Sequence, residues 1–311
     1  MLRNSQVAQR PIDHAADTVD VSLEQDTATL LLCPPDHFDV TYQINPWMDL
    51  DGWHARRDDW RAKAMEEWQT LKAFYESLGH RVMTIEPAHG QPDMVFMANC
   101  AAVLDGTAVM AHFRHPERQG EEPFYRHFYA QLKNAGVIDA MAFLPEGIAF
   151  EGCGDALWDG ARGMFWIGYS QRTSRRAPEH VSRALGVPAV ALEMATERFY
   201  HLDVALMPLS GGEVVYLPQA FNAAGLRAIH RHVPPQHRIE ASNADAGMFA
   251  VNLVNIGKDI VMSGATPALR KQLEDAGYTV HIVETPAFQL AGGSIFCLTQ
   301  RLDRRSKRAG G

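Results

Sequence analysis

Three short segments of the sequence carry side chains that could perform nucleophilic chemistry. Cys297 lies behind a pair of glycines, Glu151 follows an apolar run, and His201 and Asp203 form a His-Leu-Asp triplet. A thiolate attacks when its pKa is lowered and when an acid or base lies beside it. A thiol, an imidazole and carboxylates therefore indicate a covalent reaction on a cationic substrate. The alternative is that Cys297 is a buried structural cysteine in a terminal strand.

His201 precedes a strongly apolar run that the sequence predicts to be a strand. Alternation along a strand would place His201 and Asp203 on the same side. An imidazole beside a carboxylate is suited to moving a proton to and from a leaving amine. Most single histidines are structural, and that interpretation stays open for His201.

Two carboxylates, Glu151 and Asp155, flank the Gly-Cys-Gly triplet at 152–154. Acidic residues beside glycines are usually turn formers. Held on a tight turn, they could also bind a guanidinium, whose planar set of N–H donors matches carboxylates. Cys153 is a weaker candidate nucleophile than Cys297 because the two carboxylates would raise its pKa.

Further polar residues adjoin predicted strands. Asp93 and Asn99 bracket the strand-like run Met94–Ala98, and Arg118 and Arg172 follow strand ends. Turn formation and solvation are the ordinary roles of such residues. Two arginines could instead hold the carboxylate of an amino-acid substrate.

Composition excludes several functional classes. The 311 residues are 46% hydrophobic, and 29 basic against 37 acidic residues give a net charge of −8, which disfavours binding to nucleic acid. The four cysteines form no CxxC pair, so neither a disulfide framework nor a zinc site is indicated, and the His-rich stretch at 230–237 lacks metal-ligand spacing. No run approaches the roughly 18 apolar residues of a membrane span. We expect a protein without metal or membrane, located in the cytoplasm.

Short apolar runs alternate with helical patterns along the chain, which predicts an α/β fold. Gly79, Gly136, Gly186 and Gly277 each follow a helical pattern and precede a strand, so a unit of a few strands and one helix recurs about five times. Helices are predicted at about 58–78, 122–135, 178–185, 223–232 and 267–276. Strands are predicted at 29–33, 81–85, 101–104, 108–111, 141–144, 156–158, 164–167, 189–192, 204–208, 213–217, 248–253, 260–262 and 279–283.

The same pattern indicates a single domain. No Gly/Ser linker or change in composition interrupts residues 27–303, whereas residues 1–26 and 304–311 are expected to be flexible segments. Neither a GxGxxG motif after a first strand nor a GxxxxGK[ST] motif occurs, so the phosphate-binding loops of dinucleotide and P-loop folds are missing.

Three motifs in order carry a resemblance to a known family. Phe-Glu-Gly-Cys-Gly-Asp at 150–155, His-Leu-Asp at 201–203 and Gly-Gly-Ser-Ile-Phe-Cys-Leu-Thr at 292–299 resemble the guanidine-modifying amidinotransferase/hydrolase superfamily. That group includes arginine deiminases, dimethylarginine dimethylaminohydrolases, amidinotransferases and arginine dihydrolases. The resemblance covers about 31–302 and implies a five-bladed β/α propeller, or pentein, with pseudo-fivefold repeats around a central active-site pocket.

The resemblance also implies roles for individual residues. Cys297 would attack the guanidinium carbon, His201 would act as general acid and base, and Glu151 would orient His201. A covalent amidino-thioether would form and would be resolved by water or by an acceptor amine, without a metal or organic cofactor. The residues that the resemblance places beside the substrate are Asp93, Asn99, Asp203, Arg118, Arg172, Asn45 and Asp155.

Three departures from the family pattern bear on the substrate. The interval between Glu151 and Asp155 is one residue longer than usual, and Phe296 stands where many deiminases have histidine. Asn99 stands where deiminases and dimethylarginine hydrolases have an aspartate that binds the guanidinium. Since an amide both donates and accepts hydrogen bonds, Asn99 would tolerate a neutral ureido group and permit a second hydrolysis.

Asn99 and the segment at 33–48, which includes Asn45, resemble the arginine dihydrolase branch in particular. We therefore expect a cysteine hydrolase of arginine. Dimethylarginine hydrolysis and amidino transfer remain alternatives, as does a propeller that only binds a partner. The sequence leaves open whether the chain forms a homo-oligomer.

Overall fold

The computed structural model describes residues 27–306 and contains five small sheets of three strands each within that range. In every sheet, an antiparallel pair is extended by a third strand that pairs in parallel. The sheets have the orders β15-β1-β2, β3-β4-β5, β6-β7-β8, β9-β10-β11 and β12-β13-β14. Five sheets of one pattern agree with the five repeats that the sequence predicts.

The strands are short, and most of them are largely buried. Their bounds are β1 Thr29–Leu32, β2 Arg81–Thr84, β3 Ala101–Leu104, β4 Thr107–Met110, β5 Ala140–Ala142, β6 Ala156–Asp159, β7 Met164–Tyr169, β8 Ala189–Glu193, β9 Leu206–Pro208, β10 Val214–Tyr216, β11 Arg238–Glu240, β12 Val254–Ile256, β13 Asp259–Met262, β14 Thr279–Ile282 and β15 Gln300–Arg301.

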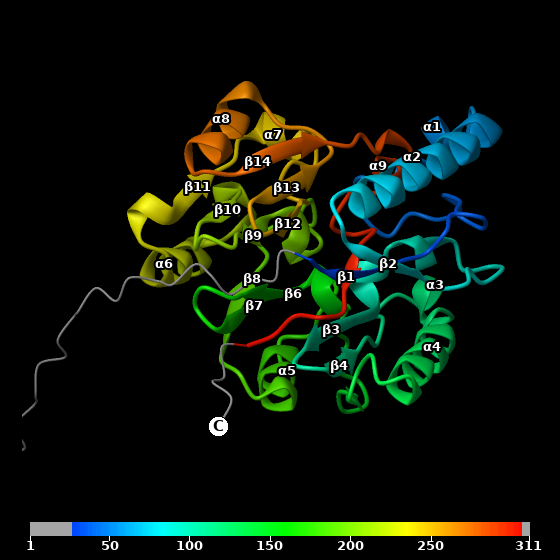
Figure 1. Ribbon diagram of the computed structural model, residues 1–311, viewed down its shortest axis with the longest axis horizontal. Helices are drawn as coiled ribbons and strands as arrows, with labels where there is room; N and C mark the ends of the chain where they lie inside the picture. The colour runs from blue at the N-terminus through cyan, green and yellow to red at the C-terminus, as the bar shows by residue number, and fades with distance from the viewer. Residues whose placement is uncertain (1–26, 307–311) are drawn as a thin grey trace, which may run out of the picture.

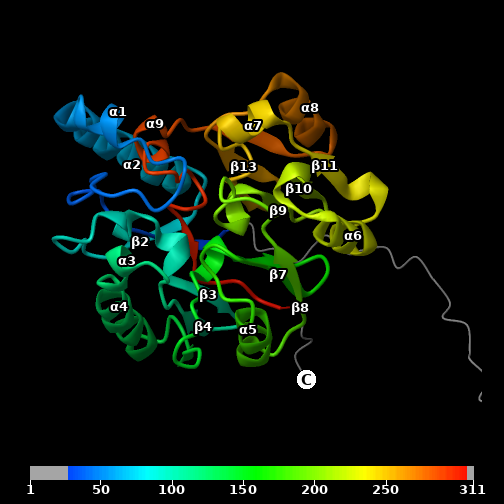
Figure 2. The same cartoon turned by 180° about the vertical axis from the view of Figure 1, so that it is seen from behind.

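Helices make the crossovers to the third strands, because two parallel strands cannot be joined by a tight hairpin. Figures 1 and 2 show these helices on the periphery of the molecule and the strands nearer its middle. Helices α7 and α9 instead lead from one sheet to the next. The bounds are α1 Leu50–His54, α2 Arg57–Ser77, α3 Pro116–Gln119, α4 Glu122–Asn134, α5 Ala177–Leu185, α6 Ala223–His232, α7 Asn243–Gly247, α8 Pro267–Asp275 and α9 Pro286–Gln289.

Helix α2 illustrates how the sequence specifies these crossovers. Ala64, Trp68, Leu71 and Tyr75 recur at spacings of three and four and are buried. Burial of a side chain such as Leu71 contributes about 2 kcal/mol. The chain then turns at Gly79, whose φ of 84° is readily adopted only by glycine. The observed α2 agrees with the predicted helix to within one residue at each end.

The first sheet joins the two ends of the described chain. Strand β1 pairs in parallel with β2 and antiparallel with β15, so that Leu30 lies opposite Arg301. In Figure 1 the red C-terminal segment accordingly runs beside the blue β1. Residues 292–299, which include Cys297, are therefore held between α9 and a strand of the first sheet.

Three expectations about strands are wrong. The predicted strand at 248–253 is instead a turn, in which Phe249 has a φ of 52° and the Ala250 N–H donates to the Asp245 carbonyl. The run at 94–98 forms 3₁₀ turns, Pro92–Val95 and Met97–Cys100. Likewise, the residues after His201 form a 3₁₀ turn, Leu202–Val204, so strand alternation does not govern their directions. Apolar composition identified buried segments in each case but did not distinguish a strand from a buried turn.

The described residues include the predicted domain, 27–303, but only part of the predicted flexible segments. Residues 1–26 and 307–311 lie outside the described residues, whereas Ser306 bonds to the side chain of Asp105. Within residues 27–306, no helix is long and apolar enough to cross a membrane.

Candidate active site

In each sheet, the turn before the edge strand that pairs antiparallel with the middle strand carries a polar residue that is almost fully buried. Asn99 precedes β3, Glu151 precedes β6, His201 precedes β9, Asn252 precedes β12 and Cys297 precedes β15. Tight turns at equivalent places in five repeats can bring side chains together that are far apart in sequence. Burial of so many polar groups is costly unless they are paired or complete a ligand site.

The sulfur of Cys297 lies between a carboxyl and an amide. Its Sγ is 3.3 Å from Asp203 Oδ2 and 3.1 Å from Asn252 Nδ2. Burial and the neighbouring Asp203 raise the pKa of the Cys297 thiol well above its ordinary value. Burial likewise raises the pKa of Asp203 well above its ordinary value, although hydrogen bonds from Cys297 and Asn252 oppose this. Without a cation, this part of the site favours the protonated thiol.

His201 is held by Glu151. Nε2 of His201 lies 2.8 Å from Glu151 Oε2, and the same oxygen lies 2.9 Å from Nη1 of Arg172. Burial would raise the pKa of Glu151, but Arg172 and His201 together lower it below its usual range. Burial lowers the pKa of His201 to about 4, against the opposing effect of Glu151. The neutral imidazole therefore donates its Nε2–H to Glu151 and keeps Nδ1 as an acceptor.

A second buried arginine organises the neighbouring residues. Arg118 donates to both carboxylate oxygens of Glu121 at 2.8 and 2.9 Å, and its Nη1 donates to Asn99 Oδ1 at 2.8 Å. Asp93 Oδ2 is 3.8 Å from Arg118 Nε and accepts the hydroxyl of Tyr42 at 2.9 Å. The Arg118 bond fixes the orientation of the Asn99 amide, so that its Nδ2 is directed elsewhere.

Five of the sequence-predicted residues keep one buried polar atom without a hydrogen-bonding partner among the described residues. Such atoms are rare in folded proteins and call for an explanation. They are Asp93 Oδ1, Asn99 Nδ2, Arg172 Nε, His201 Nδ1 and Asp203 Oδ1. The set contains both donors and acceptors, as expected for a site that a polar ligand completes.

Gly154 lies between two of these atoms. A Cβ atom at Gly154 would lie 2.4 Å from Asn99 Nδ2 and 3.0 Å from His201 Nδ1. Any side chain at this position would therefore collide with both of them. The absence of a side chain at Gly154 thus lets Asn99 and His201, which lie on turns of different sheets, both approach the same point of the backbone.

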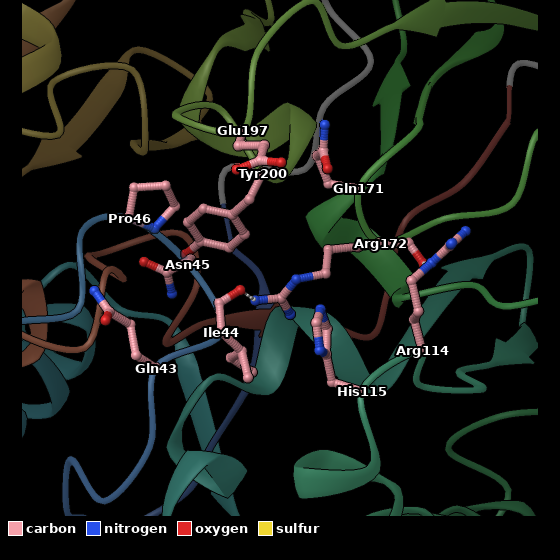
Figure 3. A pocket seen from close by; sticks show the side chains of 10 residues that line it. All are labelled: Gln43, Ile44, Asn45, Pro46, Arg114, His115, Gln171, Arg172, Glu197 and Tyr200. Carbon is pink, nitrogen blue, oxygen red and sulfur yellow. Dashed lines mark hydrogen bonds between the residues drawn. The ribbon is translucent and has the colours of Figure 1, made fainter.

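An open cavity of about 470 Å³ adjoins the buried cluster. Figure 3 shows Arg172 directed into it, beside Tyr200 and the backbone of Ile44. Nη2 of Arg172 donates to the Ile44 carbonyl at 3.0 Å, and its guanidinium lies 4.9 Å from the centre of the Tyr200 ring. Asn45 also lines the cavity, but its amide already bonds to the Ala291 carbonyl and the Trp47 N–H.

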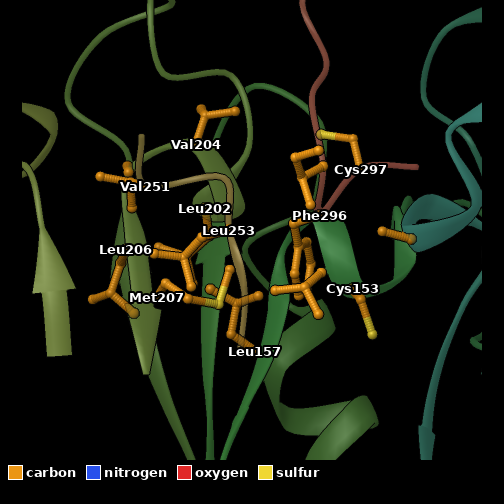
Figure 4. Close-up of a cluster of buried hydrophobic side chains, with 14 of the residues drawn as sticks. Cys153, Leu157, Leu202, Val204, Leu206, Met207, Val251, Leu253, Phe296 and Cys297 are labelled. Atoms are coloured by element: carbon orange, nitrogen blue, oxygen red, sulfur yellow. The ribbon is translucent and has the colours of Figure 1, made fainter. Parts of the chain in front are cut away.

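Asp155 and Cys153 lie apart from this set. Asp155 Oδ1 accepts the Leu202 N–H at 3.0 Å, and burial raises the pKa of Asp155 to about 7 although Thr173 and this N–H oppose the change. These bonds fix the turn that follows His201. Cys153 belongs to the apolar core, and in Figure 4 Phe296 extends into the same cluster whereas Cys297 lies at its edge. Burial also raises the pKa of Cys153.

Asn252 contacts the Cys297 sulfur, yet no sequence motif indicates it. The apolar run around it predicts a strand, and an isolated asparagine in such a run carries no motif. Its place in the repeat is the signal that could have identified it. Each of the other four repeats has a polar residue just before the edge strand that pairs antiparallel with the middle strand.

Comparison with known proteins shows the family. The model of the family described as N,N dimethylarginine dimethylhydrolase, eukaryotic, matches residues 35–304. The dimethylarginine dimethylaminohydrolase of Mycobacterium tuberculosis is 36% identical over 273 residues, which cover 88% of this chain and 85% of that protein. The chain belongs to the dimethylarginine dimethylhydrolase family. The resemblance expected from the three motifs is thereby confirmed.

Another relative of this chain is the bifunctional arginine dihydrolase/ornithine cyclodeaminase ArgZ of Synechocystis. It is 38% identical over 277 residues, which cover 89% of this chain but only 38% of ArgZ, so the chain spans about two fifths of that relative. A Cys-to-Ser mutant of the N-terminal domain of ArgZ, bound to substrate, superposes with a TM-score of 0.82 at 36% identity, over 89% of this chain and 99% of that domain. The same domain, covalently bound to a reaction intermediate, gives a TM-score of 0.82 at 36% identity.

Proposed function

We propose that this chain is a cysteine-dependent hydrolase that acts on the C–N bonds of arginine through a covalent amidino-thioether. The observation that carries the proposal is the pairing of Cys297 with Asp203, a buried carboxyl without a cationic partner among the described residues. A guanidinium is a cation whose planar N–H donors match such a carboxyl. The relationship to arginine dihydrolases and dimethylarginine hydrolases supports the same chemistry.

In the first step, the Cys297 thiol gives its proton to the unpartnered Nδ1 of His201, and the resulting thiolate attacks the guanidinium carbon. The cation bound at Asp203 offsets the negative charge that otherwise keeps the thiol protonated. The resulting tetrahedral adduct expels ammonia, which takes a proton from His201, and the amidino group stays on sulfur. Water then attacks the amidino carbon while His201 accepts its proton, and the C–S bond breaks to release citrulline and the thiolate.

Of the two arginines, Arg172 is the better candidate for holding the carboxylate of the substrate. Arg172 faces the cavity and has an unpartnered Nε, which is a donor for a carboxylate. Arg118 is already paired with Glu121, so we assign it mainly to orienting Asn99 and Asp93. Asp93 keeps one free oxygen that could accept the α-ammonium group.

Asn99 supports a second round of hydrolysis. Its oxygen is occupied by Arg118, so its free Nδ2 presents a donor and no negative charge. A ureido carbonyl oxygen accepts such a bond, whereas a guanidinium has no acceptor for it. In the second round, Cys297 attacks the ureido carbon, ammonia leaves, and hydrolysis releases ornithine and carbon dioxide. Two waters are consumed and two ammonia molecules are formed for each arginine.

The five sheets support the finer architecture expected from the sequence, a five-bladed propeller around a central site, because each repeat contributes a residue from the same kind of turn. The four free cysteines support a reducing compartment such as the cytoplasm. Dimethylarginine hydrolysis is the competing activity, supported by the family match.

Product analysis separates these activities. The purified chain is incubated with arginine, citrulline or dimethylarginine, with and without glycine, and products are measured by mass spectrometry. We expect ornithine and ammonia from arginine without accumulating citrulline. Dimethylamine release, guanidinoacetate formation from glycine, or stalled citrulline would favour dimethylarginine hydrolysis, amidino transfer or single hydrolysis, respectively.

Two variants test the nucleophile. Cys297→Ser should lose turnover by at least about 10⁴-fold, because a serine hydroxyl is not ionised in this site. Cys153→Ser is the matched control, since Cys153 is also buried but lies in the apolar core. Equal turnover by Cys297→Ser and the unmodified protein would reject the assignment.

A further inference from the structure

We infer that Asn252 is a catalytic residue that donates a hydrogen bond to the Cys297 sulfur and stabilises its thiolate form. The inference rests on the proposed function in one respect, namely that Cys297 is the nucleophile. Asn252 is fully buried on the turn before β12 and has no place among the motifs that suggested the reaction.

The neighbours of Asn252 fix the direction of its amide. Oδ1 accepts the backbone N–H groups of Phe296 at 3.1 Å and Cys297 at 3.2 Å. On the other side, Nδ2 lies 3.3 Å from the Asp203 carbonyl, which can only accept. These three contacts exclude the flipped amide, since a flip would set N–H against N–H and oxygen against oxygen. The N–H of Asn252 therefore points at the sulfur, 3.1 Å away, independently of the protonation of the thiol.

The two side chains at the sulfur have opposite effects on it. Asp203 disfavours a thiolate until a cation arrives, whereas the Asn252 amide is neutral and can donate to sulfur in every state. A hydrogen bond from a neutral donor to an anion is stronger than one to the neutral thiol. When the thiolate forms and the Asp203 carboxylate pairs with the guanidinium, the hydrogen bond from Asn252 to the sulfur strengthens. The donor is already in position, so forming the thiolate requires no movement of this amide.

Asn252 also sets the position of the sulfur. Its Oδ1 binds the backbone at Phe296 and Cys297, and its own carbonyl accepts the Phe296 N–H at 3.2 Å. One side chain thus holds both the segment that carries the nucleophile and the nucleophilic atom. The backbone N–H of Asn252 is anchored in turn to the Phe249 carbonyl at 3.0 Å.

The test uses two variants of Asn252 and a reaction that needs no substrate. Asn252→Asp keeps the oxygen that accepts from Phe296 and Cys297 but replaces the donor to sulfur with an acceptor. Asn252→Ala removes the donor without adding charge. Carbamidomethylation of Cys297 by iodoacetamide is followed across pH by peptide mass analysis, with Cys297→Ala as the background. Thermal unfolding identifies the variants that fold.

We expect Asn252→Ala to slow alkylation at neutral pH by about tenfold and to move its pH profile to higher pH, and Asn252→Asp to do so more strongly. With arginine, kcat should fall by at least the same factor while KM changes little, because the amide contacts the sulfur and not the amino-acid end. A purely structural role would lower the unfolding temperature without moving the alkylation profile.

Asn255→Asp is the matched control. Asn255 is an amide of the same repeat, and its Nδ2 donates to the carbonyls of Gly257 and Asp259 at 3.0 Å, away from Cys297. The Asn255→Asp variant should keep the alkylation profile of the unmodified protein. An unchanged profile in either Asn252 variant that folds would overturn the inference. A protein that alkylates as expected but does not hydrolyse arginine would refute the proposed function and leave the role of Asn252 in thiolate stabilisation intact.

Discussion

Glu151 and Asp203 are both fully buried carboxyl groups, yet their surroundings drive their pKa values in opposite directions. Glu151 has Arg172 and His201 as partners, and their effect overcomes burial, so its pKa is lowered. The Asp203 carboxyl has the Cys297 thiol and no cation beside it among the described residues, so burial dominates and its pKa is raised. The difference follows from the presence or absence of a nearby cation.

The comparison indicates which half of the site is complete. The Glu151 half is balanced by residues of the chain itself and can hold His201 in a fixed orientation before any ligand arrives. The Asp203 half lacks positive charge and keeps one oxygen without a partner among the described residues. We expect a cationic substrate to supply that charge, so that binding and activation of the thiol are coupled at Asp203.

Removing the negative charge of Glu151, in the half of the site that is already balanced, should reduce turnover the most. In Glu151→Gln, His201 loses the carboxylate that orients it and Arg172 loses its buried partner, so kcat should fall by about 10³-fold. The acid limb of the kcat/KM profile should move to lower pH, because Glu151 raises the pKa of His201. Glu122→Gln is the control, since Glu122 is a buried carboxylate that pairs with Arg126 outside the site. A loss of less than tenfold would contradict the orienting role of Glu151.

Asp203→Asn should separate binding from thiol reactivity. The variant loses a charge-assisted contact to the guanidinium, so kcat/KM for arginine should fall by about 100-fold. Asp203 raises the pKa of Cys297, so its replacement should lower that pKa and accelerate alkylation at neutral pH without substrate. Asp159→Asn, at a buried aspartate paired with Arg162, provides the control. Slower alkylation in Asp203→Asn would mean that the carboxyl acts as a base for the thiol.

Trp47→Ala should admit water to the buried site and so reduce the electrostatic difference between its Glu151 and Asp203 halves. The Trp47 indole donates to the Arg198 carbonyl at 2.5 Å and packs against Phe249 at 4.8 Å between ring centres, which holds the segment that lines the cavity. Loss of these contacts should accelerate alkylation of Cys297 by about tenfold and raise KM severalfold with a smaller change in kcat. Unchanged alkylation would show that this segment does not control access to Cys297.

Asp155→Asn should alter stability with little effect on turnover. The folded-state pKa of Asp155 is about 7, above its ordinary 3.8, so the folded chain is favoured at low pH and loses this contribution as pH rises through about 7. Asparagine keeps the acceptor for Leu202 and does not titrate. The variant should therefore lose less stability between pH 4 and 7, by on the order of 2 kcal/mol. Equal slopes in denaturant titrations would contradict the raised pKa.

The sequence predicted the repeats well because their signals are local. The apolar stripe of α2 and Gly79 after it define a helix without knowledge of any other segment. The turns were mispredicted because burial removes the alternation that distinguishes exposed from buried faces. In the turn around Phe249, long-range packing and a positive φ override the β propensity of an apolar run.

The site was predictable where a motif carried it. Cys297, His201 and Glu151 could be named from ordered motifs, and their pairing with Asp203 and Arg172 is in the structure. Asn252 could not be named, because its role depends on contacts across 45 residues of sequence to Cys297. The ion pair between Arg118 and Glu121 could likewise not be predicted, because no sequence pattern indicates which carboxylate an arginine will meet.

The pairing of β15 with β1 has a consequence for the newly synthesised chain. Cys297 lies only three residues before β15, and β15 is anchored by the first strand of the described chain. A nascent chain that lacks the last strand can form its local hairpins but leaves one edge of β1 unpaired. In such a chain Cys297, the proposed nucleophile, is not yet fixed opposite Asp203 and Asn252. Cys297 should therefore reach its place opposite Asp203 and Asn252 only when β15 docks on β1.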